Sequence, residues 1–352
     1  MIFVARMRVH LPFAFLAAQI VWLTSAVPSA AAPGDTVYAV PGLRVDAGGH
    51  GLNLYCMGSG RPAVVFDSGW EDWAPAWAFV QPAVSRWTRT CTYDRAGSGF
   101  SDAGPLPRTS VQIADELHAA LHAAGVTGPY ILVGHSFGSY NTRAFADRYM
   151  SEVAGLVLVD GEDGDVEPAS DRHSDDSSLA GFAGQLIRCG RAVAVHAALP
   201  ALQLGMGKTI PCDRQFFRGL PEKTWSPQLN AAVLHIVATR TTLYNAVVSE
   251  LLEMPWDEVY LISHLRSFGS RPVRVLTAQN HYYDTAATPA RVHQRHLADE
   301  REEARNQARW LTLSSNSKQI FAYQSGHYIE LDQPELVIAA IHDVLTESRN
   351  ER

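Results

Sequence analysis

The segment 134–138 (GHSFG) constrains the fold of this chain more than any other feature. An apolar run, 130–133 (YILV), stands directly before it, and a helix-like stretch, 137–149, follows. A serine in this context occupies a sharp strand-to-helix turn, which projects its hydroxyl above a sheet at a helix N-terminus. Glycines on either side let the neighbouring backbone pack closely. We therefore predict that Ser136 is a nucleophile and not a residue of an ordinary turn.

The wider sequence alternates apolar strands with helical stretches. The predicted strands are 52–57, 63–67, 88–94, 130–133, 153–159, 271–277 and 318–323, and the predicted helices are 110–124, 137–149, 229–254 and 334–347. Continuous apolar strands that alternate with helices are typical of a parallel sheet covered on both faces. The predicted fold class is therefore α/β.

The alternation stops after residue 161 and resumes at about residue 270. The interrupted part begins with an acidic stretch that lacks the spaced ligands and central glycine of an EF-hand, which favours a solvated loop over a calcium site. Helical stretches follow. Since the insertion separates two strands of one sheet, we predict a core of 33–161 and 270–352 with a helical cap or lid, 162–269.

The N-terminus has the layout of a secretory signal peptide. Arg6 and Arg8 precede an apolar run, 11–23, and small residues follow at 25–32. The apolar run is short for a bilayer span. We predict a signal peptide over 1–32, a secreted or periplasmic protein, and no stable membrane insertion after cleavage. An uncleaved membrane anchor is the alternative.

Composition excludes several other classes of protein. With 47% apolar residues the chain is not disordered, and its net charge of −7, without a basic stretch interleaved with aromatics, gives no reason to expect a nucleic-acid partner. The sequence has no CxxC pair, and no ligand-spaced His/Asp set suggests a metal, so no metal and no cofactor are expected. Four cysteines in an exported protein allow two disulfides.

A serine nucleophile needs a base, because its hydroxyl is a poor nucleophile at its ordinary pKa. His327 follows the last predicted core strand, which places it at the same sheet edge as Ser136. It is therefore the predicted base. His135 is interpreted as a turn-packing residue and His281 as an exposed loop residue.

Four segments in the same order resemble the α/β-hydrolase superfamily, specifically its capped bacterial esterase/lipase-like branch. They are 66–70 (FDSGW), 93–102 (YDRAGSGFSD), 134–138 (GHSFG) and 326–335 (GHYIELDQPE). The resemblance implies the α/β-hydrolase fold, a Ser-His-Asp triad, and an oxyanion hole made by the backbone N–H groups of Phe137 and Trp70. It implies no catalytic role for Arg95.

The sequence departs from the superfamily pattern at two places. Ser68 stands where many relatives have histidine, and Ser139 stands where a glycine is frequent. A backbone oxyanion donor does not depend on the first of these side chains. The second change affects helix packing and not the chemistry.

The acid of the triad is less well defined by the resemblance. In much of the superfamily it follows the strand that is 271–277 here, but Asn280 and His281 stand at the expected positions, and Asp284 is the nearest carboxylate. The superfamily also uses the end of the strand after the nucleophile helix, which is Asp160 here. We favour Asp160, with Asp284, or another acid such as Asp163, as alternatives.

The resemblance also implies a pairing for the cysteines. In the sheet order of the superfamily, the strands that carry Cys56 and Cys91 are neighbours, and Cys189 and Cys212 both fall in the predicted cap. We therefore expect the disulfides Cys56–Cys91 and Cys189–Cys212. Four buried thiols are the alternative.

The sequence thus predicts a secreted serine hydrolase that acts on a small-molecule carboxylic ester. Epoxide hydrolases and haloalkane dehalogenases of the same fold carry aspartate at the position of Ser136. Amide or peptide hydrolysis of the aminopeptidase type, lactone hydrolysis and C–C bond hydrolysis are the chemical alternatives. A non-catalytic binding protein of the same fold is the rival from another class.

Overall fold

The computed structural model describes residues 34–161, 176–203, 209–217, 225–264, 266–281, 284 and 288–350. The predicted signal peptide and Asp163 lie outside these described residues. Within them, no helix is both long enough and apolar enough to cross a membrane.

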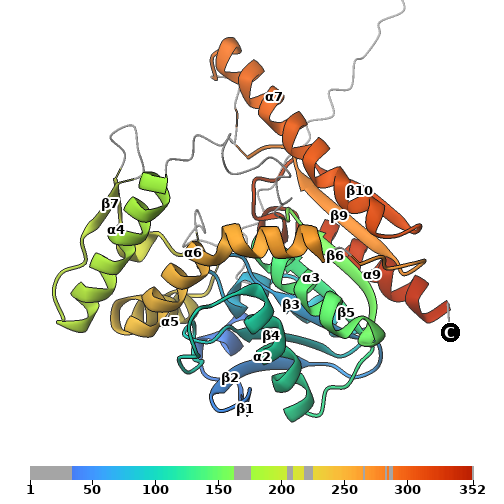
Figure 1. Cartoon of the computed structure of the whole chain (residues 1–352), viewed down its shortest axis with the longest axis horizontal. Coiled ribbons are helices and arrows are strands. Elements are labelled where there is room, and N and C mark those ends of the chain that lie inside the picture. Colours follow the sequence, from blue (N-terminus) through green and yellow to red (C-terminus); the bar gives the residue numbers. More distant parts are fainter. Residues whose placement is uncertain are drawn as a thin grey trace, which may run out of the picture. The chain divides into compact units, whose positions relative to one another are not determined.

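Eight strands form one sheet in the order β1-β2-β4-β3-β5-β6-β9-β10 (Figure 1). Their bounds are β1 Leu43–Asp46, β2 Gly51–Met57, β3 Ala63–Asp67, β4 Thr90–Asp94, β5 Tyr130–His135, β6 Val153–Val159, β9 Val273–Ala278 and β10 Ser317–Ala322. All pairs from β4 to β10 are parallel, whereas β1 and β2 pair antiparallel to each other and β2 pairs antiparallel to β4. The mostly parallel sheet confirms the predicted fold class.

Helices cover both faces of this sheet. The α-helices are α1 Gln81–Val84, α2 Ser110–Ala123, α3 Gly138–Tyr149, α4 Asp176–Ala194, α5 Pro227–Thr239, α6 Thr241–Ser263, α7 Ala290–Gln307, α8 Ile329–Asp332 and α9 Pro334–Asn350. The short 3-10 helices are Asp35–Ala39, Ala74–Trp77, Met150–Glu152, Cys212–Arg214 and Ala308–Leu313, and β7 (Ala201–Gln203) pairs with β8 (Thr209–Pro211).

The side chains of each strand alternate between the two faces. In β5, Ile131 and Val133 pack in the hydrophobic cluster that includes α9, whereas Tyr130 and Leu132 pack in the cluster that includes α2 and α3. All four side chains are fully buried. This burial on both faces explains why the strand is apolar throughout and not alternately polar.

The predicted helix 229–254 is two helices in the structure. α5 ends at Thr239 and α6 begins at Thr241, because Arg240 between them has an extended backbone. The Arg240 guanidinium donates hydrogen bonds to the carbonyl oxygens of Gly99 (2.6 Å) and Ser101 (2.5 Å). A distant tertiary contact thus interrupts a segment whose local pattern is helical.

Two disulfides are present, Cys56–Cys91 and Cys189–Cys212. The first joins directly paired residues of β2 and β4, and the second joins α4 to the segment after β8. The pairing agrees with the one that the family resemblance implied.

The segment between β6 and β9 contains α4, α5 and α6 (Figure 1). In α6, Leu243, Val247 and Leu251 are buried, whereas Leu252 is 43% exposed. Trp73 and Trp77, which follow β3, are fully buried in the same hydrophobic cluster as those α6 residues. These tryptophans therefore pack in the core.

Candidate active site

Ser136 lies in the turn between β5 and α3. Its φ of 49° is in the left-handed region, which is strained for a residue with a side chain. The turn is fixed by two hydrogen bonds: the Ser136 N–H donates to Val159 O (3.1 Å), and the Ser139 N–H donates to Ser136 O (2.8 Å). Gly138 permits the turn, since a Cβ there would lie 2.4 Å from Asp67 O. The strand–turn–helix predicted around Ser136 is present.

Asp160 directly follows β6 and is buried. Its Oδ1 accepts hydrogen bonds from the Ala278 N–H (2.9 Å) and the Gln307 side-chain amide (3.0 Å). Its Oδ2 is 2.7 Å from His327 Nδ1 and 2.7 Å from His281 Nε2. Burial opposes ionisation, but these histidine hydrogen bonds outweigh it and hold the pKa of Asp160 below its usual range. Asp160 is therefore a carboxylate at neutral pH.

His327 lies in the loop after β10, with 39% of its side chain exposed. Its backbone oxygen is 3.0 Å from His135 Nε2, so this loop lies against the residue that precedes Ser136. The rings of His135 and His327 are 4.7 Å apart. The structure thus brings His327 to Asp160 and to the Ser136 turn, at the carboxyl ends of β5, β6 and β10.

His281 is a member of this cluster that the sequence interpretation missed. Its Nδ1 is 3.1 Å from Glu300 Oε2, while its Nε2 contacts Asp160. Burial disfavours the imidazolium, but hydrogen bonds to Asp160 and Glu300 outweigh it and raise the pKa of His281 to about 10. His281 stands where the resemblance predicted an acid, and only the fold reveals that it faces Asp160.

Asp284 contacts a different pair of histidines. Its Oδ2 is 2.6 Å from His293 Nδ1, and its Oδ1 is 2.8 Å from His296 Nδ1. Both contacts are to residues of α7. The structure describes two of the candidate acids, Asp160 and Asp284. Of these two, Asp160 contacts His327.

The residues of the two predicted oxyanion donors, Phe137 and Trp70, belong to segments next to Ser136. Phe137 is the N-cap residue of α3, where the helix dipole favours negative charge. Trp70 follows Gly69, and a Cβ on Gly69 would lie 2.9 Å from His135 Nδ1. The chain at 69–70 therefore approaches the residue before Ser136 as closely as a glycine permits. The Trp70 indole N–H donates to Val247 O of α6 (2.9 Å).

Arg95 holds the loop that carries Trp70. This buried guanidinium donates hydrogen bonds to Ser68 O and Gly69 O, both at 2.7 Å. It also donates to Glu250 of α6 (2.9 Å) and to Asp67 (3.1 Å). Arg95 therefore joins the end of β3 to α6, which is a positioning role and not a catalytic one.

Buried titratable groups surround the turn. Burial lowers the pKa of His135 to about 3, with His327 adding to the effect, so His135 is neutral. Its Nδ1 is 3.2 Å from Glu330 Oε1, and burial raises the pKa of Glu330 well above its usual value. Burial also raises the pKa of Asp72 to about 7, against the opposing effect of Arg95. His135 thus packs in the turn, as the sequence predicted.

Known proteins share this fold. Residues 62–196 match the family model described as the alpha/beta hydrolase fold. An AB hydrolase superfamily protein from Gibberella zeae is 24% identical over 306 residues, covering 81% of this chain and 86% of that protein. Three other curated relatives match over only 15%, 19% and 43% of their length, so the chain spans less than half of each.

Solved structures agree with the family model. A thermophilic esterase from Thermogutta terrifontis has a TM-score of 0.56 at 21% identity, covering 87% of this chain and 98% of that one. A putative epoxide hydrolase from Pseudomonas aeruginosa has a TM-score of 0.58 at 16% identity, covering 88% and 96%. The chain therefore has the α/β-hydrolase fold.

Proposed function

We propose that the chain is a secreted serine hydrolase that cleaves carboxylic esters through an acyl-enzyme. The observation that carries the proposal is the 2.7 Å contact between His327 Nδ1 and Asp160 Oδ2, at the sheet edge where the Ser136 turn lies. A carboxylate on Nδ1 fixes the tautomer in which Nε2 is free to accept a proton. The strained turn is the position at which this fold presents a nucleophile.

In this mechanism His327 Nε2 takes the Ser136 proton as the hydroxyl oxygen attacks the ester carbonyl. The backbone N–H groups of Phe137 and Trp70 donate to the oxyanion of the tetrahedral intermediate. The intermediate expels the alcohol, which receives the proton from His327. Water, deprotonated by the same histidine, then releases the acid and restores Ser136. Asp160 stays ionised throughout and stabilises the imidazolium.

Two further features belong to this proposal. We propose that residues 162–269 form a cap, since Trp70 and Arg95 of the core each bond to α6. We also propose that residues 1–32 are a signal peptide. The two disulfides support export, because such bonds persist in oxidising compartments. The substrate is then a small extracellular or periplasmic ester.

The test is hydrolysis of p-nitrophenyl esters from acetyl to long acyl chains. Ser136→Ala should leave almost no turnover, because the members of a triad act as a unit. Asp160→Asn should lower kcat by about 10⁴-fold, since an amide favours the wrong histidine tautomer. Asp284→Asn is the matched control and should keep the wild-type rate, because its partners are His293 and His296.

Other outcomes have defined meanings. A full loss in Asp284→Asn with Asp160→Asn active would reverse the assignment of the acid. Absence of turnover on every ester by folded protein would overturn the esterase proposal. The amide, lactone and C–C substrates of the same fold would then be tested. Epoxide hydrolysis is disfavoured by the serine at position 136, since the family resemblance implies aspartate there in the epoxide hydrolases of this fold.

A further inference from the structure

A second cluster of metal-ligating side chains lies apart from the candidate active site, on α2 and the 3-10 helix before β6. His118 and His122 are four residues apart on α2, so they lie on the same face of the helix. Glu152 comes from the 3-10 helix Met150–Glu152. The candidate ligand atoms of the three residues lie within 4.8 Å of one another.

Each histidine contacts a different oxygen of the carboxylate. His118 Nε2 is 2.9 Å from Glu152 Oε1, and His122 Nε2 is 3.2 Å from Glu152 Oε2. The two imidazole rings are 4.3 Å apart. Both Nε2 atoms therefore point to one place. Two imidazoles and a carboxylate are a donor set that zinc prefers, and three protein ligands leave a fourth position for water.

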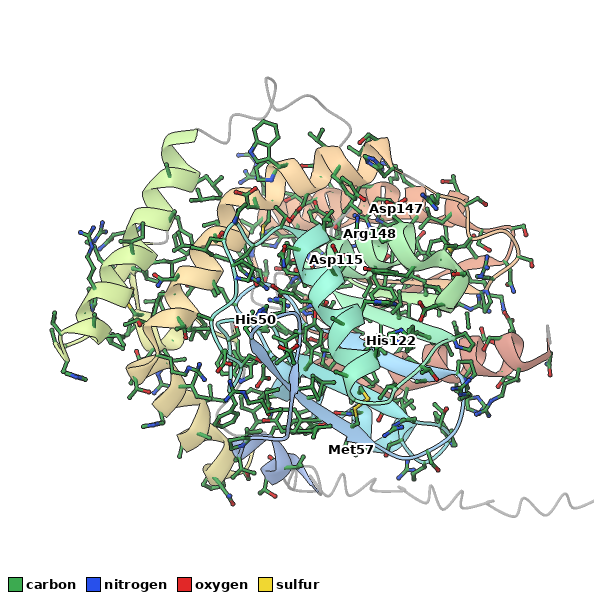
Figure 2. The ribbon with its side chains drawn as sticks, turned by 60° about the horizontal axis from the view of Figure 1, so that its bottom comes forward. His50, Met57, Asp115, His122, Asp147 and Arg148 are labelled. Atoms are coloured by element: carbon green, nitrogen blue, oxygen red, sulfur yellow. A yellow bond between two sulfur atoms is a disulfide. The ribbon has the colours of Figure 1, made fainter. Side chains whose placement is uncertain are left out.

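The surroundings hold these ligands in place. The His118 ring stacks on Tyr149 at 3.7 Å, and the Tyr149 hydroxyl donates to Asp115 (2.7 Å). Arg148 of α3 also bonds to Asp115, one turn before His118; Figure 2 shows Asp115 and His122 along α2. Glu152 packs against Gly128, where an added Cβ would lie 3.0 Å from Glu152 Cβ. Tyr149 of α3 thus supports His118, and Gly128 packs against Glu152.

Solvent reaches the cluster, which a metal ion requires for entry. The side chains of His118, Glu152 and His122 are 21%, 28% and 44% exposed.

We propose that His118, His122 and Glu152 form a binding site for Zn²⁺ that joins α2 to the start of β6. This proposal departs from the sequence analysis, which led us to expect no metal. A third ligand could not be recognised from the sequence, because Glu152 lies thirty positions beyond His122.

The test is titration of the purified, chelator-treated full chain with Zn²⁺ in a calorimeter near neutral pH. His122→Ala and Glu152→Gln should each weaken one binding event at least about tenfold, because loss of even an outer-shell partner has effects of that size. His235→Ala is the matched control, since His235 is an exposed histidine on α5. It should bind as the wild type does.

A second variant separates this cluster from the one at Asp160, whose two histidines also lie near a carboxylate. The same binding event should persist in His281→Ala. Zn²⁺ should also raise the thermal midpoint of the wild type and of His281→Ala, but not that of His122→Ala. Absence of Zn²⁺ binding by the wild type, undiminished binding by His122→Ala, or loss of the event in His281→Ala would each overturn the proposal.

Discussion

At the scale of single residues, the carboxylate of Asp160 takes part in more hydrogen bonds than a catalytic triad requires. Two histidines share its Oδ2, and the second, His281, is itself held by Glu300. A charged hydrogen bond of this kind contributes roughly 1.5–3 kcal/mol. We therefore propose that His281 is a positioning residue, which holds Asp160 toward His327.

His281→Ala should lower kcat for ester hydrolysis by about tenfold with KM unchanged, a loss of about 1.4 kcal/mol of transition-state stabilisation. His281→Gln should recover part of the loss, because its amide nitrogen can donate to Asp160. Steady-state kinetics on one ester would measure both. His293→Ala, which removes a contact to Asp284 only, is the control. Equal kcat in His281→Ala and wild type would refute the positioning role.

The buried carboxyl of Asp72 predicts a pH effect on stability. Its pKa in the folded protein is raised to about 7 by burial, whereas in an unfolded chain it is about 3.9. The folded state therefore binds more protons between these values, so the free energy of unfolding falls as pH rises through that window. Above it, the ionised group destabilises the fold in full.

Asp72→Asn removes the destabilisation that the buried, ionised carboxylate causes. Relative to wild type, the variant should gain about 2 kcal/mol more stability at about pH 8 than at about pH 5. Urea unfolding at the two pH values would measure it, with Asp46→Asn as an exposed control. A stability difference that does not change with pH would contradict the assignment.

At the scale of secondary-structure elements, the contact between α6 and the core depends on buried charges. Arg95 and Glu250 are both buried and 2.9 Å apart, and Arg95 also bonds the carbonyls of the Trp70 loop. Neither partner carries a local signal in the sequence, because they are 155 positions apart. The interruption between α5 and α6 at Arg240 has no local signal either, because Arg240 bonds to Gly99 and Ser101, which are distant in the sequence. Local patterns predict elements well and their tertiary contacts poorly.

Glu250→Gln should lower the free energy of unfolding by about 2–3 kcal/mol, because it leaves Arg95 buried with one carboxylate fewer. Ester hydrolysis should also slow, since the loop bearing Trp70 loses part of its support. Chemical unfolding and steady-state rates would measure the two effects. Glu253→Gln, three residues along α6 and partly exposed, should match the wild type in both. A Glu250→Gln variant as stable as this control would contradict the account.

At the scale of the whole molecule, the sheet was predictable because its central strands β3, β5 and β6 are buried on both faces and hence largely apolar. The location of Ser136 and His327 at one edge of the sheet was predictable too, because Ser136 follows the buried strand β5 and His327 follows β10. The choice of Asp160 over Asp284 needed the fold, which alone places the latter against α7. His281 could not be assigned, because its partners Asp160 and Glu300 lie on other elements.

The two disulfides give a prediction at this scale. In the chain-entropy model, loops of 35 and 23 residues correspond to stabilisation of about 3–4 kcal/mol each. A Cys189→Ser/Cys212→Ser variant should lose about that much stability, measured by urea unfolding under oxidising conditions. Adding a reductant should destabilise the wild type further than it does this variant. Equal stability of the variant and the wild type would argue against the second bridge.

We propose above that Ser136 is a nucleophile activated by His327 and Asp160. The most direct test is labelling with a serine-directed fluorophosphonate, followed by mass spectrometry of the peptides. We expect one adduct on the peptide that contains Ser136, no adduct in Ser136→Ala, and slow labelling in Asp160→Asn. A folded wild-type protein that remains unlabelled, or one labelled at another serine, would contradict the claim and favour a binding protein of the same fold.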